Sequence, residues 1–449
     1  MIGAAMLCLN ELLSDYKEID FLPNRLDLDS TIVLLRLAGN VSLSGISEIL
    51  RTQGYANDST GMISQRLTDF GARLPNTLNL GKPTVVFYLS DEIYASGLPI
   101  LVTIDPVSTA ILKIELSSNC QADTWKKHFQ SIESNGISAR GLASDRGVGI
   151  VQGYQLFHDN LVWCSDHFHE FRGLTKLLRT LESQAYEAIT REAERFRVFN
   201  NARTESNLQK QLEAFEEAKV DCEKKMATYQ YVEDVLELLF PALYFFDLNT
   251  GEHRQKTKVK AELLTLMDLL DQLELDKLQK ETKAIRSHID DICICYQQVE
   301  DIFQRLSQTI AKENLEMIGL AWQHDHQSHQ HKGAHKKYHK SERDGWLEIV
   351  TPLLGKNANA LIERAFEEFN GMVRTSSLIE MVNSLIRPYI NECKGQISQE
   401  HLNLIMFYHN YHQYKSGKRK AKAPIELLMK MKLEKNWLEL LFETISQTK

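Results

Sequence analysis

The chain has 449 residues and a formal net charge of -8, with 43% hydrophobic and 25% charged residues. This length accommodates two or three domains, each with its own core, and the composition is typical of a soluble globular protein. The acidic balance excludes a surface that coats an anionic polymer along its whole length. It leaves room for local basic patches, which are what binding in a groove requires.

The cysteines and the apolar runs indicate the compartment. The seven cysteines are odd in number, scattered and without a CxxC pair, which favours a reducing environment and argues against a zinc knuckle. Residues 1–13 are mildly apolar but contain Glu11 and no basic n-region, so we expect an amphipathic helix and not a signal peptide. No uninterrupted apolar run reaches about 18 residues, so we expect no membrane span and a cytoplasmic protein.

Residues 1–76 read as short helices punctuated by glycine turns and N-cap residues. Three such helices are typical of a helix-turn-helix module, in which the third helix would present Gln65 and Arg66 to phosphates and base edges. A plain three-helix packing module explains the same pattern equally well. The expected helices are Ser30–Ala38, Gly45–Thr52 and the segment from Met62 to Phe70.

Residues 77–169 alternate short apolar, β-branched runs with turn residues, which predicts an α/β sheet. The first three strands form an antiparallel meander, and the crossover helix 121–134 leads to a fourth strand that could lie parallel to the first. The expected strands are Thr84–Tyr88, Ile100–Ile104, Ala110–Leu116, Gly141–Ser144 and Leu161–Trp163.

Two of these strands deliver an acid. The first is expected to stop just before Asp91, and the fourth runs directly into Asp145 and a glycine turn. If the two strands are parallel neighbours, both carboxylates lie at the carboxyl edge of the sheet, where open α/β sheets place their sites. Two such acids can share a hard cation. Aspartate is also common after strands as a turn former or helix cap, so the signal is not specific alone.

Two histidines and an acid follow the fifth strand in the segment 164–169. A metal site is one interpretation, but His167 and His169 diverge if the segment is already helical. The favoured alternative is a strand end that leads into a helix with Phe168 docked in the core.

Residues 170–343 change to long Glu-, Lys- and Gln-rich segments with heptad-like apolar spacing, which predicts an all-helical insertion. The insertion ends in a histidine-rich tract interleaved with lysines. Irregular spacing and the absence of cysteine partners disfavour a dedicated zinc site, and a mobile, partly basic connector that contacts DNA phosphates fits better. The histidines are His324, His326, His329, His331, His335 and His339, and the lysines are Lys332, Lys336, Lys337 and Lys340.

Residues 344–449 return to helical periodicity. Glu380, Asn383 and Arg387 are three and four positions apart and share one helix face. A solvated helix face with Glu and Arg would show the same spacing. Asparagine has a low helix propensity, however, so its place in mid-helix favours a functional role. Beyond it lies a cationic loop that we interpret as a nucleic-acid edge, although charge runs are usually only solvated. Its basic residues include Lys418, Arg419, Lys420 and Lys422.

Three acids resemble the catalytic acids of DDE transposases of the insertion-sequence type. They are Asp91, Asp145 and Glu380, which stand in that order on a strand, a second strand and a helix. The resemblance covers roughly residues 84–428. Its most specific pieces are Asp91-Glu92, Ser144–Gly147, Asp166–His169, Glu380–Asn383 with Arg387, and the ending from His409 to Pro424.

The resemblance implies an α/β ribonuclease-H-like catalytic core with a long all-α insertion, preceded by an N-terminal helix-turn-helix-like module. It also implies metal-dependent DNA cleavage and strand transfer at element ends. Two Mg²⁺ ions, for which Mn²⁺ can substitute, would be bridged by Asp91 and held individually by Asp145 and Glu380. Asn383 or Arg387 would orient a carboxylate or a phosphate, and His167 would support the site.

The implied partners are double-stranded DNA, as element ends and target, and a second copy of the chain on that DNA, in a nucleoid-associated setting. Two alternatives stay open. One is a domesticated DNA-binding protein that keeps the fold without turnover. The other is a related metal nuclease, which the N-terminal helical module disfavours because sequence-specific docking suits end recognition better.

Overall fold

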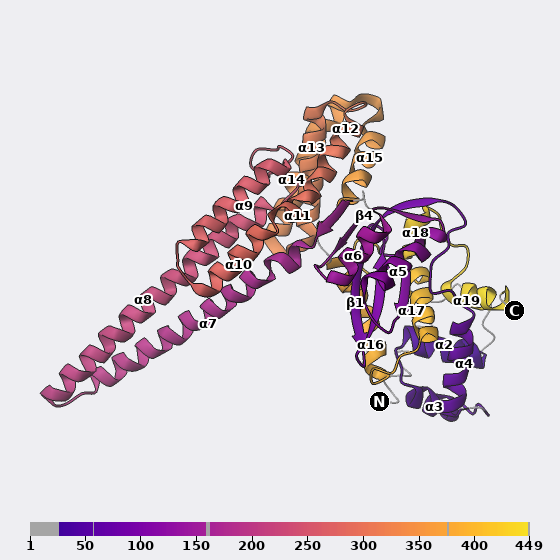
Figure 1. The fold of residues 1–449 in the computed structure, drawn as a ribbon, viewed down its shortest axis with the longest axis horizontal. Coiled ribbons are helices and arrows are strands. Elements are labelled where there is room, and N and C mark those ends of the chain that lie inside the picture. The colour runs from indigo at the N-terminus through magenta and orange to yellow at the C-terminus, as the bar shows by residue number, and fades with distance from the viewer. Residues whose placement is uncertain (1–26, 57, 159–161, 375–376, 448–449) are drawn as a thin grey trace. The chain divides into compact units, whose positions relative to one another are not determined.

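The computed structural model describes residues 27–449 except 57, 159–161, 375–376 and 448–449. The helix expected at residues 1–13 lies outside the described residues. The chain forms two compact units (Figure 1): Met1–Trp163 with Thr375–Lys449, and Cys164–Arg374. The second unit therefore begins and ends outside the limits 170 and 343 expected for the helical insertion.

The first unit contains a mixed sheet with the strand order β3-β2-β1-β4-β5. β1 pairs antiparallel with β2, which pairs antiparallel with β3, and β1 pairs parallel with β4. The predicted meander and the predicted parallel neighbours are both confirmed. The strands are β1 Thr84–Ala95, β2 Leu98–Ile104, β3 Ile111–Leu116, β4 Ile137–Ser144 and β5 Val162–Ser165.

The prediction that the first strand ends before Asp91 is wrong. β1 continues to Ala95, and Asp91 pairs with Val102 inside the antiparallel ladder. The reason is the two-residue turn Ser96-Gly97, where φ is 47° and 84° respectively, a conformation that closes a tight hairpin. Pairing with β2 thus extends the strand through acidic residues of low strand propensity.

The described residues of the first unit also form ten helical segments. α4 packs against α17 so closely that a Cβ on Gly71 would lie 2.0 Å from the carbonyl oxygen of Glu400. The three expected N-terminal helices are present, the first as α2 continued by a π-helical segment. The segments are α2 Leu28–Val33, η1 Leu34–Ala38, α3 Leu43–Thr52, α4 Thr60–Ala72, α5 Ala122–Ser134, α6 Val148–Phe157, α16 Ser377–Glu392, α17 Gln399–Tyr411, α18 Pro424–Met429 and α19 Trp437–Gln447.

The second unit is helical in its described residues, with α7 and α8 side by side as a long hairpin (Figure 1). The single isolated bridge Phe246–His253 closes the turn after α8. The segments are α7 His167–Asn200, α8 Glu205–Ala242, α9 Lys256–Asp271, α10 Asp276–Ser287, α11 Ile289–Cys293, η2 Ile294–Tyr296, α12 Gln297–Leu306, α13 Lys312–Gln330, α14 Gly333–Leu354, η3 Gly355–Asn357 and α15 Ala358–Asn370. None of the described helices is long and apolar enough to cross a bilayer.

The histidine-rich tract is not a mobile connector. It forms the facing parts of α13 and α14, which pack against each other as a helical hairpin. His324 and His339 are 2% and 9% exposed, and an ion pair of 2.8 Å joins Asp325 to Arg343 across the two helices. The hairpin forms because part of the tract follows the helical period and buries one face.

Phe168 does not dock in the core, because it is 52% exposed. Asp166 caps α7 by accepting a hydrogen bond from the Phe168 backbone N–H, which makes His167 the first helical residue. His167 is the buried side chain instead, and its Nε2 lies 2.8 Å from the carbonyl oxygen of Ile292.

Side-chain amides of α17 cover part of the outer edge of β3. Asn410 accepts from the Ile111 N–H at 2.8 Å and donates to the Ile111 carbonyl at 2.9 Å, as a neighbouring strand would. Gln399 makes the equivalent pair of bonds to Leu116 and Ile114. The amides therefore satisfy backbone groups that an edge strand leaves unpaired.

The substitution Asn410→Leu is expected to lower the free energy of unfolding by about 2 kcal/mol or more, because both buried backbone groups of Ile111 lose their partners. Urea unfolding followed by circular dichroism measures this change. Gln413→Leu, at an exposed position two residues past α17, is the control and should leave the midpoint nearly unchanged. Equal midpoints for the two variants would contradict this role of Asn410.

Candidate active site

The parallel register of β1 and β4 brings two of the predicted acids together. Leu89 pairs with Ala143 at the end of the ladder, and Asp91 and Asp145 each follow two residues later. α16 packs against β1, and Asn383 Nδ2 donates a hydrogen bond of 2.8 Å to Asp91 Oδ2. Both aspartates and the helix that carries Glu380 therefore meet within the first unit.

Electrostatic coupling links the three predicted acids. Burial, together with the charges of the Asp145 and Glu380 carboxylates, raises the pKa of Asp91 to about 8. Like charges act on each other in this way only at short range or in a poorly solvated site. The structure thus gathers Asp91, Asp145 and Glu380, which are far apart along the chain.

Each carboxylate is held by a local contact. The backbone N–H of Glu92 donates to Asp91 Oδ1 at 2.9 Å, and that of Gly147 donates to Asp145 Oδ1 at 2.9 Å. A Cβ at Gly147 would lie 3.1 Å from the same Asp145 oxygen, so the close approach favours glycine. Glu380 pairs with Arg387 at 3.2 Å.

The helix face that carries Glu380, Asn383 and Arg387 has a buried part and a solvent-exposed part. Asn383 is fully buried, whereas the side chains of Glu380 and Arg387 are 34% and 52% exposed. The Glu380–Arg387 pair therefore contributes little to stability, and its effect is to orient the carboxylate.

Glu92 is a fourth carboxylate that sequence reasoning did not assign to the site. Its Oε1 would lie 3.6 Å from a Cβ on Gly147, and its Oε2 is buried without a hydrogen-bond partner among the described residues. Burial and the charge of Asp145 raise the pKa of Glu92 to about 7. The Asp91-Glu92 pair was visible in the sequence, but nothing near it in the chain shows that Glu92 lies close to Asp145 in the fold.

The chemistry of these side chains fits a hard divalent cation, because all four offer carboxylate oxygens and one buried oxygen has no partner. Over the described ranges, however, no three His, Cys, Asp or Glu side chains are arranged to hold a metal ion. The oxygens of these acids are therefore not gathered around one point in this structure.

The residues predicted to contact DNA fall into two groups. Gln65 and Arg66 on α4 bond to Asp69 and Asp29, and Arg419 donates to the carbonyl of Val107 at 3.0 Å. These side chains make contacts within the protein itself. The second group consists of exposed lysines of the cationic loop, Lys418, Lys420 and Lys422. His167 belongs to the helical unit.

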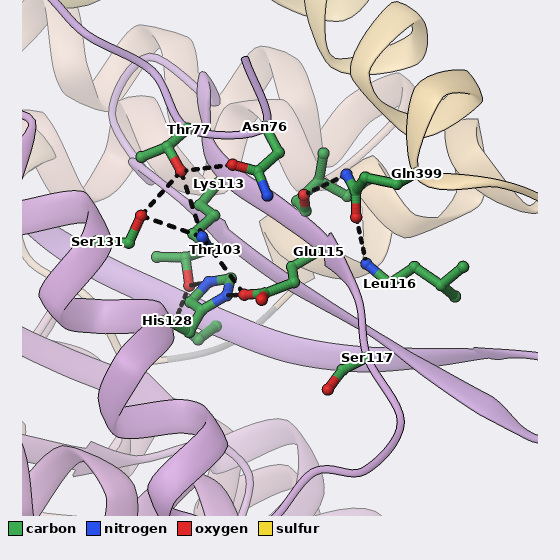
Figure 2. Close-up of polar contacts among 12 residues, drawn as sticks. Asn76, Thr77, Thr103, Lys113, Glu115, Leu116, Ser117, His128, Ser131 and Gln399 are labelled. Carbon is green, nitrogen blue, oxygen red and sulfur yellow. Dashed lines mark hydrogen bonds and ion pairs between the residues drawn. The ribbon is translucent and has the colours of Figure 1, made fainter. Parts of the chain in front are cut away.

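A second polar cluster has the residue types of a catalytic triad (Figure 2). Thr103 Oγ1 lies 3.0 Å from His128 Nε2, and Glu115 Oε2 lies 3.1 Å from His128 Nδ1. Burial lowers the pKa of His128 to about 4, so the imidazole is neutral at pH 7. Thr103 and His128 are both fully buried, so no substrate reaches the hydroxyl, and the cluster joins β2 and β3 to α5.

No protein-family model matches this chain, and no curated protein sequence matches it significantly.

Asp91→Asn is expected to stabilise the protein at pH 8. The pKa of Asp91 is about 8 in the folded chain against an ordinary value of 3.8, so the native state loses stability as the pH rises from about 4 to 8. Asparagine removes that loss, and Asn383 can flip so that its unpaired Oδ1 accepts from the new amide. The gain should be on the order of 1–3 kcal/mol at pH 8 and should shrink towards pH 4.

Thermal unfolding at pH 4, 6 and 8 measures this pH dependence. Asp69→Asn, at an exposed site on α4, serves as the control and should show a small difference from the wild type that does not vary with pH. A gain for Asp91→Asn that is the same at pH 4 and pH 8 would show that burial does not raise the pKa of Asp91.

Proposed function

We propose that this chain is a DDE-type DNA transposase, whose first unit is a ribonuclease-H-like catalytic core interrupted by the helical unit. The observation that carries the proposal is the electrostatic grouping of Asp91, Asp145 and Glu380. The chain order supports it as well, because the acids stand on the central strand β1, directly after β4 and in the first turn of α16.

The reaction cleaves a phosphodiester with a water oxygen, which frees a 3′ hydroxyl and leaves the phosphate on the flanking 5′ end. The freed 3′ hydroxyl then attacks a target phosphodiester, whose own 3′ oxygen leaves as the new bond forms. Asp91, Asp145 and Glu380 would hold two Mg²⁺ ions, or Mn²⁺, which when bound supply charge stabilisation for the attacking and leaving oxygens. The chain's own residues orient the acids. Asn383 fixes Asp91, and Arg387 directs Glu380.

Double-stranded DNA is the proposed partner, as the element's ends and as its target, and a homodimer on DNA is the proposed assembly in a nucleoid-associated setting. The exposed lysines of the cationic loop support DNA contact, because phosphate recognition needs local positive charge and not a basic protein overall. The N-terminal helices α2 to α4 are proposed as a helix-turn-helix-like module, in which Gln65 is exposed.

Asp145→Asn should abolish metal-dependent DNA cutting, with a loss of at least about 100-fold in rate, because one ligand charge disappears while the fold is kept. Gel analysis of a supercoiled plasmid that carries the DNA flanking the reading frame, with Mg²⁺ or Mn²⁺, measures the rate. Asp69→Asn is the matched control and should cut like the wild type.

Equal cutting by Asp145→Asn and the wild type would remove the proposal. DNA binding by the wild type without cutting at any metal concentration would instead identify a catalytically silent DNA-binding protein of transposase origin.

Replacing Lys418, Lys420 and Lys422 together by glutamine should weaken DNA binding and flatten its dependence on salt. Each phosphate contact contributes about 0.9 to the slope of log affinity against log salt, so the slope should fall by up to roughly 3. Fluorescence anisotropy over a salt series measures both effects. The control replaces three exposed lysines of α10, Lys277, Lys280 and Lys283, and should bind like the wild type. An unchanged slope for the loop variant would exclude the loop from the interface.

A further inference from the structure

Two histidines face each other across the α13–α14 hairpin of the helical unit. Nδ1 of His324 on α13 lies 3.0 Å from Nδ1 of His339 on α14. Both rings are nearly buried, with exposed fractions of 2% and 9%. Their contact is independent of the acids of the candidate active site, which belong to the other unit.

Further rings surround this pair. His331 stacks on His339, with centroids 5.3 Å apart and planes 16° apart, and His335 lies 5.9 Å from His331. Tyr338 packs edge-on against His339 at 5.2 Å and against His324 at 6.2 Å. The result is a cluster of four imidazoles, of which those of His324 and His339 are nearly buried and those of His331 and His335 are exposed.

The hydrogen bond between the two Nδ1 atoms needs one N–H donor and one lone pair. A first proton on the pair places a charge among buried rings, which costs free energy because the charge is poorly solvated. A second proton removes the remaining lone pair and points two N–H groups at each other. We propose that the His324–His339 contact is a proton-sensitive latch that holds α13 against α14 at neutral pH and releases it in mild acid.

The surroundings of the pair favour its neutral form. Burial lowers the pKa of His324. Burial lowers that of His339 as well, followed by the charges of His324, His331 and His335, with Glu342 acting in the opposite direction. The Asp325–Arg343 ion pair joins the same two helices.

Two other α-helices, α15 and α12, pack against the hairpin. η3, with Lys356, contacts α14, and the segment after α8 contacts α13 through Tyr244 on Gln327 and His253 on Glu316. The charged residues of α15 and α12 are not among the groups that shift the pKa of His324 or His339. These residues are Glu363, Arg364, Glu367 and Glu368 on α15 and Glu300, Asp301 and Arg305 on α12.

The direction of the pH effect follows from the lowered values. A released histidine has a pKa near 6.5, so below that pH the open hairpin binds protons that the closed one does not. The closed hairpin therefore loses stability as the pH falls through 6.5. For two histidines, the population of the open form rises up to about 100-fold between pH 7.5 and 5.5.

Hydrogen exchange of the full chain at pH 7.5 and 5.5, with EDTA present and corrected for intrinsic rates, tests the latch. Peptides from α13 and α14 should open at least about tenfold more often at pH 5.5. Peptides from α9, which contains no histidine, should not change. Equal protection of α13 and α14 at both pH values, or an equal loss in α9, would overturn the proposal.

The double variant His324→Asn/His339→Asn keeps polar groups at the Nδ1 positions but cannot be protonated, so its hairpin should lose the response to pH. The single variant His324→Asn leaves one titrating ring and should respond about tenfold. His158→Asn, at a ring 36% exposed in the other unit, is the control and should respond like the wild type. A full wild-type response in the double variant would overturn the latch. If the double variant does not fold, a full wild-type response in the single variant would overturn it.

Discussion

The parallel pairing of β1 with β4 is the constraint on which the candidate active site depends. Parallel neighbours require a crossover, which α5 supplies between β3 and β4, and the register then places Asp91 and Asp145 beside each other. This arrangement has a cost, because two carboxylates are brought together where water solvates them poorly. The raised pKa of Asp91 is the measure of that cost, and the buried apolar residues of the strands offset it.

α16 brings the third acid to this pair and is fixed in its middle and at its end. In its middle Asn383 bonds to Asp91, and at its last residue Glu392 forms an ion pair with the buried Arg36 of η1. Tyr389 donates to the carbonyl of Leu37 between these points. The position of Glu380 therefore depends on contacts with the sheet and with the N-terminal helices together.

The sequence predicted the parts of the fold that follow from local pattern. Strand alternation, helical spacing and turn residues were enough for the meander and the N-terminal helices. The sequence allowed the parallel pairing of β1 with β4, and the structure shows it. The predicted end of β1 was wrong because the Ser96-Gly97 hairpin lets β1 pair with β2 past Asp91. This extension depends on contact with β2 and not on the residues of β1 alone.

Contacts distant in sequence account for the other differences. Glu92 was left out of the site because its neighbours there, Asp145 and Gly147, come from the loop after β4, which is distant in sequence. Arg66 and Arg419 were assigned to DNA from residue type alone, yet Asp29 and the carbonyl of Val107 already engage them. No periodicity in the chain reveals such partners.

The difference between satisfied and unsatisfied polar clusters shows which one is suited to function. Thr103 and His128 are fully buried, Glu115 is 31% exposed, and His128 hydrogen-bonds to both, so apolar packing could replace this cluster at little cost. At the acid cluster, Glu92 Oε2 and Asn383 Oδ1 are buried without partners among the described residues, and like charges repel. Such an arrangement lowers the stability of the fold, and unpaired polar groups and shifted carboxyl pKa values of this kind cluster at functional sites.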